Sequence, residues 1–361
     1  MERPGHDKVY PRKLEFQQLG RREVRADFDT AAINSDVGAL LILELDMKFG
    51  FLSKLAKCFD DYRDPRFTTH SVEELLSQRI FGIALGYEDL NDHEQLRHDP
   101  LLAVLAGKSD PSPKEGFALA GKSTLNRLEL TPVKANQESR YKKIVARHRD
   151  IEDFFVEAFL QVQGEAPKRI VLDVDATDDP LHGHQAGRFF HAYYKNYCYL
   201  PLYIFCGSHL LCAKLRPSNI DASAGTVKQL ERIVSLIRAQ WPKVQIVVRG
   251  DSGFCREHIM SWCESNEVDF IFGLAKNARL KRILGKELHE AKQLFEATGN
   301  AARVYKDFQY QTRKSWSRER RVVGKAEHLA KGANPRFVVT SLSAEDYDAT
   351  TLYEKEYCAS W

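Results

Sequence analysis

The chain has 361 residues, of which 43% are hydrophobic and 29% are charged, a composition typical of globular proteins that excludes a disordered chain and suffices for two packed domains. Lys and Arg number 53 against 50 for Asp and Glu, so any contact with nucleic acid must come from local basic surfaces and not from a field over the whole molecule. The seven cysteines are scattered and form no C-x-x-C pair, which argues against a disulfide framework and a zinc knuckle. No stretch approaches the roughly 20 apolar residues that a membrane span requires. We therefore expect a cytoplasmic protein with no membrane partner.

The first part of the chain is predicted to be helical after a polar start. Residues 1–37 are polar and mildly basic, contain the helix breaker Pro11 and show no sustained period, which indicates a basic arm that is loose or forms short extended segments; a solvated tail is the plain alternative. Residues 38–165 show the helical spacing of apolar residues, including a helix from Ser123 and helix again over residues 134–163. We predict an all-α domain here.

After Pro167 the pattern changes to short β-branched runs. The predicted order is β-β-β-α-β-α-β, from the strand that begins at Arg169 to the strand that ends at Leu274. With acidic residues at the ends of two strands, this order indicates an α/β fold with a ribonuclease-H-like mixed sheet over residues 166–275. Residues 276–345 are rich in Lys and Arg and contain short alternating runs, which predict a β-rich basic insertion.

Two aspartates follow predicted strands at positions suited to catalysis. Asp175 ends the first strand, and Asp251 follows the buried strand at residues 245–249. If these strands pair in parallel, the two carboxylates lie side by side at the edge where open α/β sheets place their sites. Paired carboxylates of this kind hold two Mg²⁺ ions, with Mn²⁺ as a substitute, for attack on a phosphodiester. Asp173 lies on the same strand face as Asp175 and is an alternative first metal ligand.

Several basic and imidazole side chains accompany these acids. His182 and His184 form an H-x-H pair, but no cysteine or third histidine stands at zinc-ligand spacing, so contact with phosphate or water is the alternative role. Three arginines flank the same strand ends and are candidate contacts for DNA phosphates: Arg216, Arg249 and Arg256. A fourth candidate, Arg127, lies on the helix from Ser123, which is either a recognition helix or an ordinary surface helix.

Four stretches resemble transposases of bacterial insertion-sequence family 1380, within the DDE group that carries a β-insertion in a ribonuclease-H core. They are residues 86–93 (GYEDLNDH), 173–183 (DVDATDDPLHG), 215–219 (LRPSN) and 249–254 (RGDSGF). The resemblance implies a metal-dependent enzyme that binds the terminal inverted repeats of its element in double-stranded DNA, cuts there and joins the 3′ ends to target DNA. It implies that Asp175 and Asp251 are the first two acids of the triad, that residues 38–165 bind the DNA end, and that the enzyme works as a homodimer.

The third acid of this group is a glutamate in a helix written Tyr, two residues, Arg, three residues, Glu. Tyr357 resembles the first residue of that motif, Ser360 then stands at the Arg position, and the glutamate would fall three positions past Trp361. We therefore expect residues 346–361 to be the start of the C-terminal catalytic helix region, truncated by frameshift or deletion. Glu319 and Glu327 lack the motif's Arg, and we interpret them as paired surface charges.

Three functions follow as hypotheses. The leading one is an insertion-sequence transposase whose activity suffers from the missing acid. The second is a catalytically dead DNA-binding remnant that occupies element ends and represses intact copies. The third is a ribonuclease-H-like nuclease unrelated to mobile elements, which a gene without flanking inverted repeats would favour.

Overall fold

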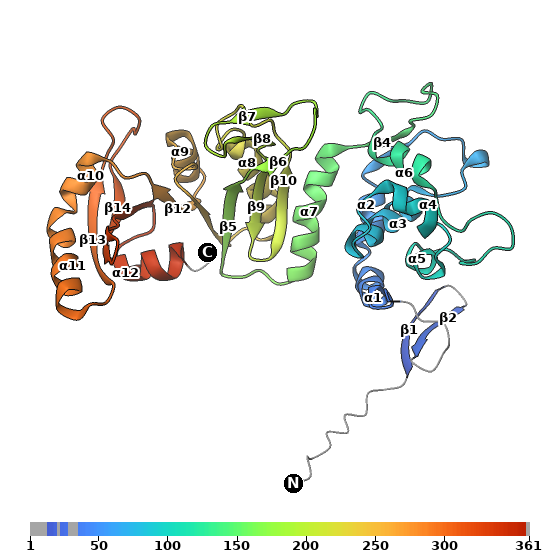
Figure 1. Ribbon diagram of the computed structural model, residues 1–361, viewed down its shortest axis with the longest axis horizontal. Helices are drawn as coiled ribbons and strands as arrows, with labels where there is room; N and C mark the ends of the chain where they lie inside the picture. Colours follow the sequence, from blue (N-terminus) through green and yellow to red (C-terminus); the bar gives the residue numbers. More distant parts are fainter. Residues whose placement is uncertain (1–12, 20–21, 28–34, 359–361) are drawn as a thin grey trace, which may run out of the picture. The chain divides into compact units, whose positions relative to one another are not determined.

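The computed structural model describes residues 13–19, 22–27 and 35–358 (Figure 1). The chain forms two compact units, residues 1–154 and 155–361, and helix α7 (His148–Gln163) runs from the first into the second. No helix in the described part of the chain combines the length and the apolar character needed to cross a membrane.

Helices dominate the N-terminal unit. A capping box starts α3 (Val72–Ala84), in which the Ser71 hydroxyl oxygen accepts a hydrogen bond from the Glu74 N–H and the Ser71 N–H donates to the Glu74 carboxylate. Two apolar clusters hold the helices together, one around Leu40 and Phe81 and the other around Leu75. The helices are α1 (Ala39–Phe49), α2 (Phe51–Ala56), α3 (Val72–Ala84), α4 (His93–Leu96), α5 (Pro100–Leu105) and α6 (Lys122–Glu129).

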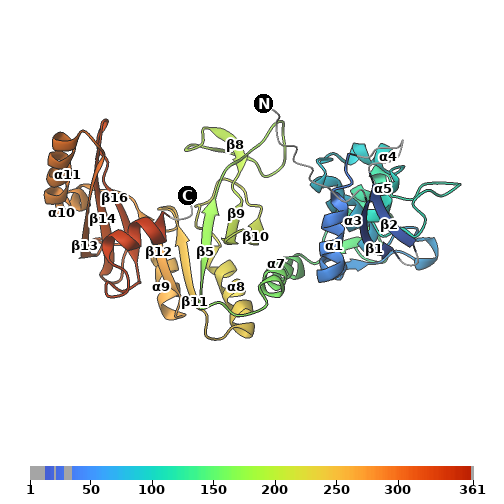
Figure 2. The same cartoon turned by 90° about the horizontal axis from the view of Figure 1, so that it is seen from below.

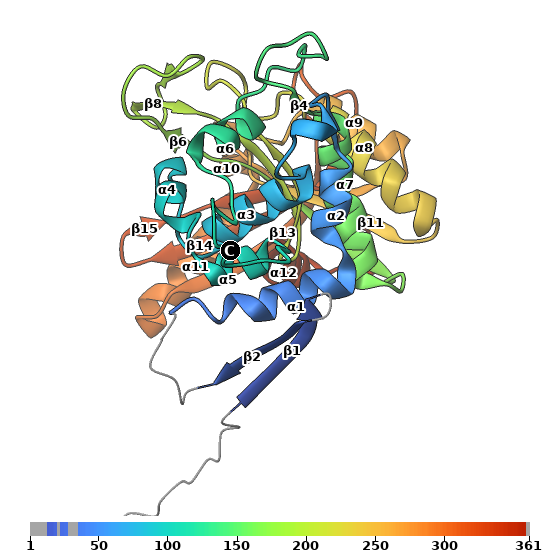
Figure 3. The same cartoon turned by 90° about the vertical axis from the view of Figure 1, so that its right-hand side faces the viewer.

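The N-terminal unit is not all-α, which corrects the prediction. Strands β1 (Lys13–Leu19) and β2 (Arg22–Asp27) form a hairpin that lies against α1 (Figure 3), so the described part of the predicted arm is extended. Strand β3 (Phe59–Asp61) pairs with β4 (Ile144–Ala146). Residues 134–147 are therefore not helical. The partner strand lies far away in the sequence, so periodicity within the segment could not reveal it.

A mixed nine-stranded sheet forms the frame of the second unit. Its order is β10-β9-β5-β11-β12, followed by β16 (Arg336–Thr340), β14 (Arg320–Leu329) and β13 (Ala302–Tyr310), with β15 (Gly332–Ala333) paired to β14. The strands β5, β11 and β12 run parallel to one another (Figure 2), while β9 is antiparallel to β5. This arrangement fits the expected ribonuclease-H-like core. The first five strands are β5 (Arg169–Ala176), β9 (Leu202–Cys206), β10 (His209–Lys214), β11 (Gln245–Gly250) and β12 (Asp269–Leu274).

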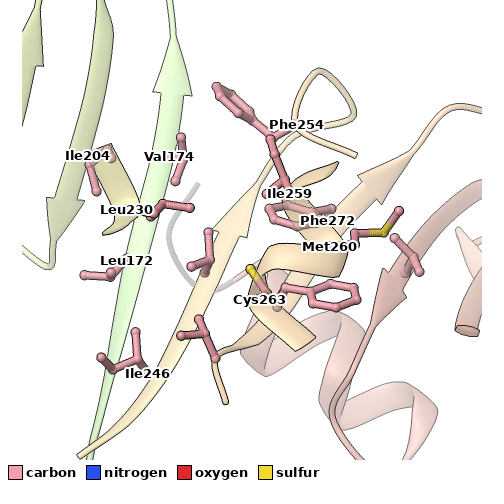
Figure 4. Close-up of a cluster of buried hydrophobic side chains, with 14 of the residues drawn as sticks. Leu172, Val174, Ile204, Leu230, Ile246, Phe254, Ile259, Met260, Cys263 and Phe272 are labelled. Atoms are coloured by element: carbon pink, nitrogen blue, oxygen red, sulfur yellow. The ribbon is translucent and has the colours of Figure 1, made fainter. Parts of the chain in front are cut away.

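One face of this sheet carries the main core. Leu172, Val174 and Ile246 point to the side on which Leu230 of α8 (Thr226–Gln240) and Ile259 of α9 (Glu257–Ser265) pack (Figure 4). The alternation of buried and half-buried residues along β5 follows from this one-sided burial, and it leaves Asp173 and Asp175 on the opposite face.

The expected β-rich insertion starts with two helices, α10 (Ala278–Ile283) and α11 (Gly285–Thr298), that the sequence interpretation missed. Its strands join the same sheet through β16, which pairs antiparallel with β12. They are β13 (Ala302–Tyr310), β14 (Arg320–Leu329), β15 (Gly332–Ala333) and β16 (Arg336–Thr340).

A final helical segment covers part of the second sheet face. It consists of α12 (Ala349–Thr351) and a π-helical turn at Leu352–Tyr357. Leu352 and Tyr353 are buried there against Val247, Ile271 and Val338.

Candidate active site

The two predicted catalytic acids lie at matching ends of neighbouring parallel strands. Arg249 pairs in register with Asp173, and Gly250 pairs with Val174. Asp251 is the next residue after Gly250, as Asp175 is after Val174. The parallel pairing on which the prediction depended is therefore present, and it brings the Asp175 and Asp251 positions together at the carboxyl edge of the sheet.

Two glycines shape the turn that carries Asp251. A Cβ atom at Gly250 would lie 3.2 Å from the Val174 carbonyl oxygen and 3.2 Å from the Phe254 ring, so glycine allows the close approach of β5. At Gly253 the N–H donates to the Asp251 carboxylate over 2.8 Å, and a Cβ atom would stand only 2.9 Å from that carboxylate. The local sequence thus fixes the direction of the Asp251 side chain.

The electrostatics of the edge fit a cation. Burial and the charge of Asp251 raise the pKa of Asp175, against the effect of a hydrogen bond from the Ala176 N–H. Repulsion between two carboxylates is the cost that a divalent cation removes, and carboxylate oxygens are the donors that Mg²⁺ prefers. The donor set of Asp175 and Asp251 therefore fits such an ion.

Asp173 has a different environment, although it shares a strand face with Asp175. The buried guanidinium of Arg249 donates to both carboxylate oxygens of Asp173, over 2.5 and 2.9 Å, and to the Glu356 carbonyl oxygen over 2.5 Å. Asp173 is thus occupied by an ion pair, which favours Asp175 as the first metal ligand. Arg249 is only 8% exposed, so we withdraw it as a phosphate contact.

The remaining predicted arginines separate into buried and accessible ones. Arg216 is 7% exposed and donates to the carbonyl oxygens of Leu200 and Ala224, so it supports the fold and does not reach DNA. The side chain of Arg256 is 41% exposed and pairs with Asp221 over 2.9 Å. Although burial opposes the shift, hydrogen bonds from Ser223 and Arg256 lower the pKa of Asp221 to about 2. Arg256 remains accessible beside the turn of Asp251.

A hollow of about 720 Å³ adjoins Asp251 and contains groups that the sequence interpretation missed. Lys276 follows β12, and Arg336 begins β16 beside it, so both cations line the hollow with Asp251. A sequence signal existed, because Lys276 stands just past the end of the third parallel strand. A second hollow of about 820 Å³ is lined by Asp173, Asp175 and Arg249.

Tyr357 closes the Asp251 hollow from the final helical segment. Its hydroxyl would lie 2.6 Å from a Cβ atom at Gly273 of β12, so that glycine is required for the close approach. Burial and the charge of Asp251 raise the pKa of Tyr357 to about 12. The phenol therefore stays protonated at neutral pH.

The family model for the transposase DDE domain group 1 matches residues 16–360 of the chain. The chain belongs to this family. Among the curated proteins none matches it. The DDE transposase family generally uses divalent metals, and membership implies DNA as the partner.

Other acids of this DDE transposase domain are engaged elsewhere. Among the described residues no group of three His, Cys, Asp or Glu side chains is arranged to hold a metal ion. The exposed His184 accepts a hydrogen bond at Nδ1 from the Arg188 guanidinium over 3.0 Å. Glu327 is 4% exposed and paired with Arg303, so it is a buried charge and not the surface charge expected. Glu319 is exposed. In the final segment Glu356 pairs with Arg169 over 2.6 Å.

Arg127, the last predicted DNA contact, lies in the N-terminal unit of the transposase. A cleft of about 360 Å³ there is lined by Arg127 of α6 and three further cations, Arg63, Arg140 and Lys143. Tyr141 lies between two of them, with the guanidinium carbons of Arg127 and Arg140 at 5.5 and 4.8 Å from its ring centre. Sequence reasoning found one of these four cations, because the others come from separate loops.

Proposed function

We propose that this chain is an insertion-sequence transposase of the type found in family 1380, which binds the terminal inverted repeats of its element, cuts there and joins the 3′ ends to target DNA. The observation that carries the proposal is the juxtaposition of Asp175 and Asp251 at matching ends of parallel strands, together with membership of the DDE family. The resemblance in four stretches along the chain adds the element type.

Each group at the edge has a distinct task in the proposed reaction. Asp175 and Asp251 hold Mg²⁺ or Mn²⁺, and the chemistry that bound ions supply is activation of the attacking oxygen and neutralisation of the leaving oxygen. Lys276 and Arg336 bind the phosphates of the strand that lies in the Asp251 hollow. Arg249 keeps Asp173 out of the ligand set through its two hydrogen bonds.

The third acid stays a prediction. The π-helical turn places Tyr357 against Gly273 next to the turn of Asp251, so a helix that continues in the pattern Tyr, two residues, Arg, three residues, Glu starts at this edge. A glutamate seven positions past Tyr357 would complete the triad. Assembly of two copies on two DNA ends likewise remains a prediction from the resemblance.

Binding of DNA ends is proposed for the N-terminal unit. The cleft around Arg127 presents four cations and one acidic residue, Asp64, together with an exposed aromatic side chain, Phe67. Cations that converge on one cleft bind phosphates even when the net charge of the protein is small. The proposed DNA-end binding therefore belongs to the N-terminal unit, and the proposed cleavage and joining belong to the second unit, which contains Asp175 and Asp251.

A cleavage and strand-transfer assay tests the function. The purified chain is incubated with DNA that carries the ends of its element, in Mg²⁺ or Mn²⁺. We expect Asp175→Asn and Asp251→Asn to reduce joining by about 100-fold or more, as removal of a group that acts in the transition state does. Asp269→Asn is the matched control, because Asp269 starts β12 at the opposite edge of the same sheet.

The outcomes separate the hypotheses. If the unchanged chain joins ends, equal joining by Asp175→Asn and Asp251→Asn would contradict the site. End binding without any cleavage would support the alternative, a catalytically dead protein that represses intact copies.

A further inference from the structure

A small three-stranded sheet projects from the edge that carries Asp175 and has a cluster of exposed aromatic rings. It consists of β6 (Asp179–Pro180), β8 (Asn196–Tyr199) and β7 (Phe189–His191) in that order, and Figure 2 shows β8 beyond the arrowhead of β5. We call it the aromatic flap. Its exposed rings are Phe189 at 41%, Phe190 at 56%, Tyr193 at 82% and Tyr197 at 49%.

The flap is fastened to the chain directly after the first catalytic acid. The Tyr194 hydroxyl donates to the carbonyl oxygen of Ala176, the neighbour of Asp175, over 3.3 Å. Asn196 donates to Asp178 over 3.0 Å, and Ser218 donates to the Phe189 carbonyl oxygen over 2.9 Å. The tip of the β7–β8 hairpin therefore has a defined position at the rim of the acidic edge.

The tip presents its most exposed ring from a constrained turn. Lys195 adopts a positive φ of 56°, a conformation that few residues other than glycine take, and its N–H donates to the His191 carbonyl oxygen over 2.8 Å. The ring of Tyr193 stands edge-on to that of Tyr194, with centres 5.0 Å apart. Tyr194 thus links the exposed Tyr193 to the Asp175 strand.

Cations are interleaved with these rings. The guanidinium of Arg188 lies 4.6 Å from the centre of the Tyr197 ring, and that ring contacts Phe190 at 5.6 Å. Lys195, two residues after Tyr193 in the same turn, is exposed. Exposed aromatic patches normally mark a binding surface, and rings interleaved with cations are the chemistry that binds the stacked bases and the backbone of single-stranded DNA.

We propose that the aromatic flap stacks, through Tyr193 and its neighbours, on an unpaired base of the DNA strand held at Asp175 and Asp251. The partner is DNA because the flap is fastened beside the acids. The base is unpaired because a base stacked inside a duplex offers no free ring face. This inference rests on the proposed function and adds to it a contact that favours a locally melted end over intact duplex.

Binding without metal tests the flap apart from catalysis. The full chain in EDTA is titrated into two fluorescent 30-base-pair DNAs, one fully paired and one with a three-nucleotide unpaired fork, and anisotropy gives the two dissociation constants. We expect the fork to bind about tenfold more tightly, and Tyr193→Ala to remove most of that preference. Tyr193→Phe keeps the ring and retains the preference.

The salt dependence identifies the kind of contact. Tyr193→Ala leaves the slope of log affinity against log salt unchanged, because no phosphate contact is lost, whereas Lys195→Ala lowers the slope. Leu294→Ala, which removes a 44% exposed apolar side chain from α11, is the control and changes neither quantity. Since Tyr193 is 82% exposed, its replacement leaves the fold intact, which thermal melting checks.

Three results would overturn the inference. The first is equal affinity for the two DNAs. The second is a loss of the preference for the fork that is as large with Tyr193→Phe as with Tyr193→Ala. The third is a self-association of the chain that Tyr193→Ala abolishes. If metal-dependent cleavage of element ends proceeds while the two DNAs bind equally, the flap inference fails alone. If neither DNA binds and no cleavage occurs, the proposed function fails with it.

Discussion

Two aspartates that stand two residues apart on β5 have opposite relations to the fold. Asp173 pairs with a buried guanidinium from the neighbouring strand, so its charge is compensated within the protein. The carboxyl of Asp175 is half-buried and faces the charge of Asp251, which raises its pKa. A charge that is kept at such a cost typically serves function, and its removal stabilises the fold.

We therefore expect Asp175→Asn to raise the melting temperature of the metal-free chain at pH 7.5 by about 1–3 °C. The folded-state pKa of Asp175 lies above the unfolded value, so the folded state binds the proton more tightly and stability falls as pH rises through this window. The increase in melting temperature from Asp175→Asn is then largest at pH values above the folded-state pKa and disappears at pH values below the unfolded-state pKa. Scanning calorimetry at several pH values measures it.

Asp173→Asn provides the contrasting control. It leaves Arg249, whose side chain is 9% exposed, without its charged partner, and we expect a loss of roughly 1–3 kcal/mol in the free energy of unfolding. Similar changes for the two variants would contradict the assignment of separate roles.

The sequence predicted this site to the level of the strand ends but not of the side-chain partners. Asp175 and Asp251 could be predicted because each stands at the end of a β-branched run that is typical of a buried strand. The sequence left Asp173 and Asp175 as alternatives, and the difference between them appears only in the structure, where Arg249 donates to both carboxylate oxygens of Asp173. The sequence predicts Arg216 to be a surface cation. Its burial could not be predicted, because the carbonyl groups that accept its hydrogen bonds belong to Leu200 and Ala224, which are 16 and 8 residues away in the chain.

At the scale of elements, the final helical segment connects the sheet to the site. Leu352 is fully buried against β11, β12 and β16, and Glu356 is held by Arg169 through its carboxylate and by Arg249 through its carbonyl oxygen. The same segment positions Tyr357 beside Asp251. Packing of this segment therefore sets the geometry of the sheet edge next to Asp251.

Leu352→Ala should lower the free energy of unfolding by about 2–5 kcal/mol, the cost of a cavity at a buried leucine. Urea unfolding measures the loss, and hydrogen exchange should show faster exchange in β11 and β12. Glu356→Gln is the milder comparison, because its ion pair with Arg169 is partly exposed, at 18% and 23%, and the carbonyl contact remains. A loss with Glu356→Gln that equals the loss with Leu352→Ala would show that charge and not packing holds the segment.

The elements that the sequence missed have two different explanations. Helices α10 and α11 could have been predicted from the sequence, because apolar residues recur there at helical spacing and Asn277 caps the first turn. These apolar residues are Leu280, Leu284, Leu288 and Ala291. The many Lys and Arg residues between them drew the interpretation toward a basic β-rich insertion. Strand β4 had no local signal, because its hydrogen bonds go to β3, more than 80 residues earlier in the chain.

At the scale of the whole molecule, charge is organised in patches although the net charge is only +3. The N-terminal unit gathers cations in the Arg127 cleft, and the second unit combines two acids with cations and exposed rings at one edge. The division of the chain into two compact units suggests that binding affinity and chemistry can be changed separately.

The last prediction uses this separation. Arg127→Ala should weaken binding to duplex DNA for every sequence and reduce the slope of log affinity against log salt by about 0.9, the contribution of one phosphate contact. Lys48→Ala, which removes an exposed cation from α1 of the same unit, should leave the slope unchanged. Metal-dependent cleavage at saturating DNA should be the same in both variants, because the acids lie in the second unit. Equal slopes for the two variants would show that the cleft does not bind the DNA backbone, and a loss of cleavage at saturation would show that Arg127 acts in the chemical step as well.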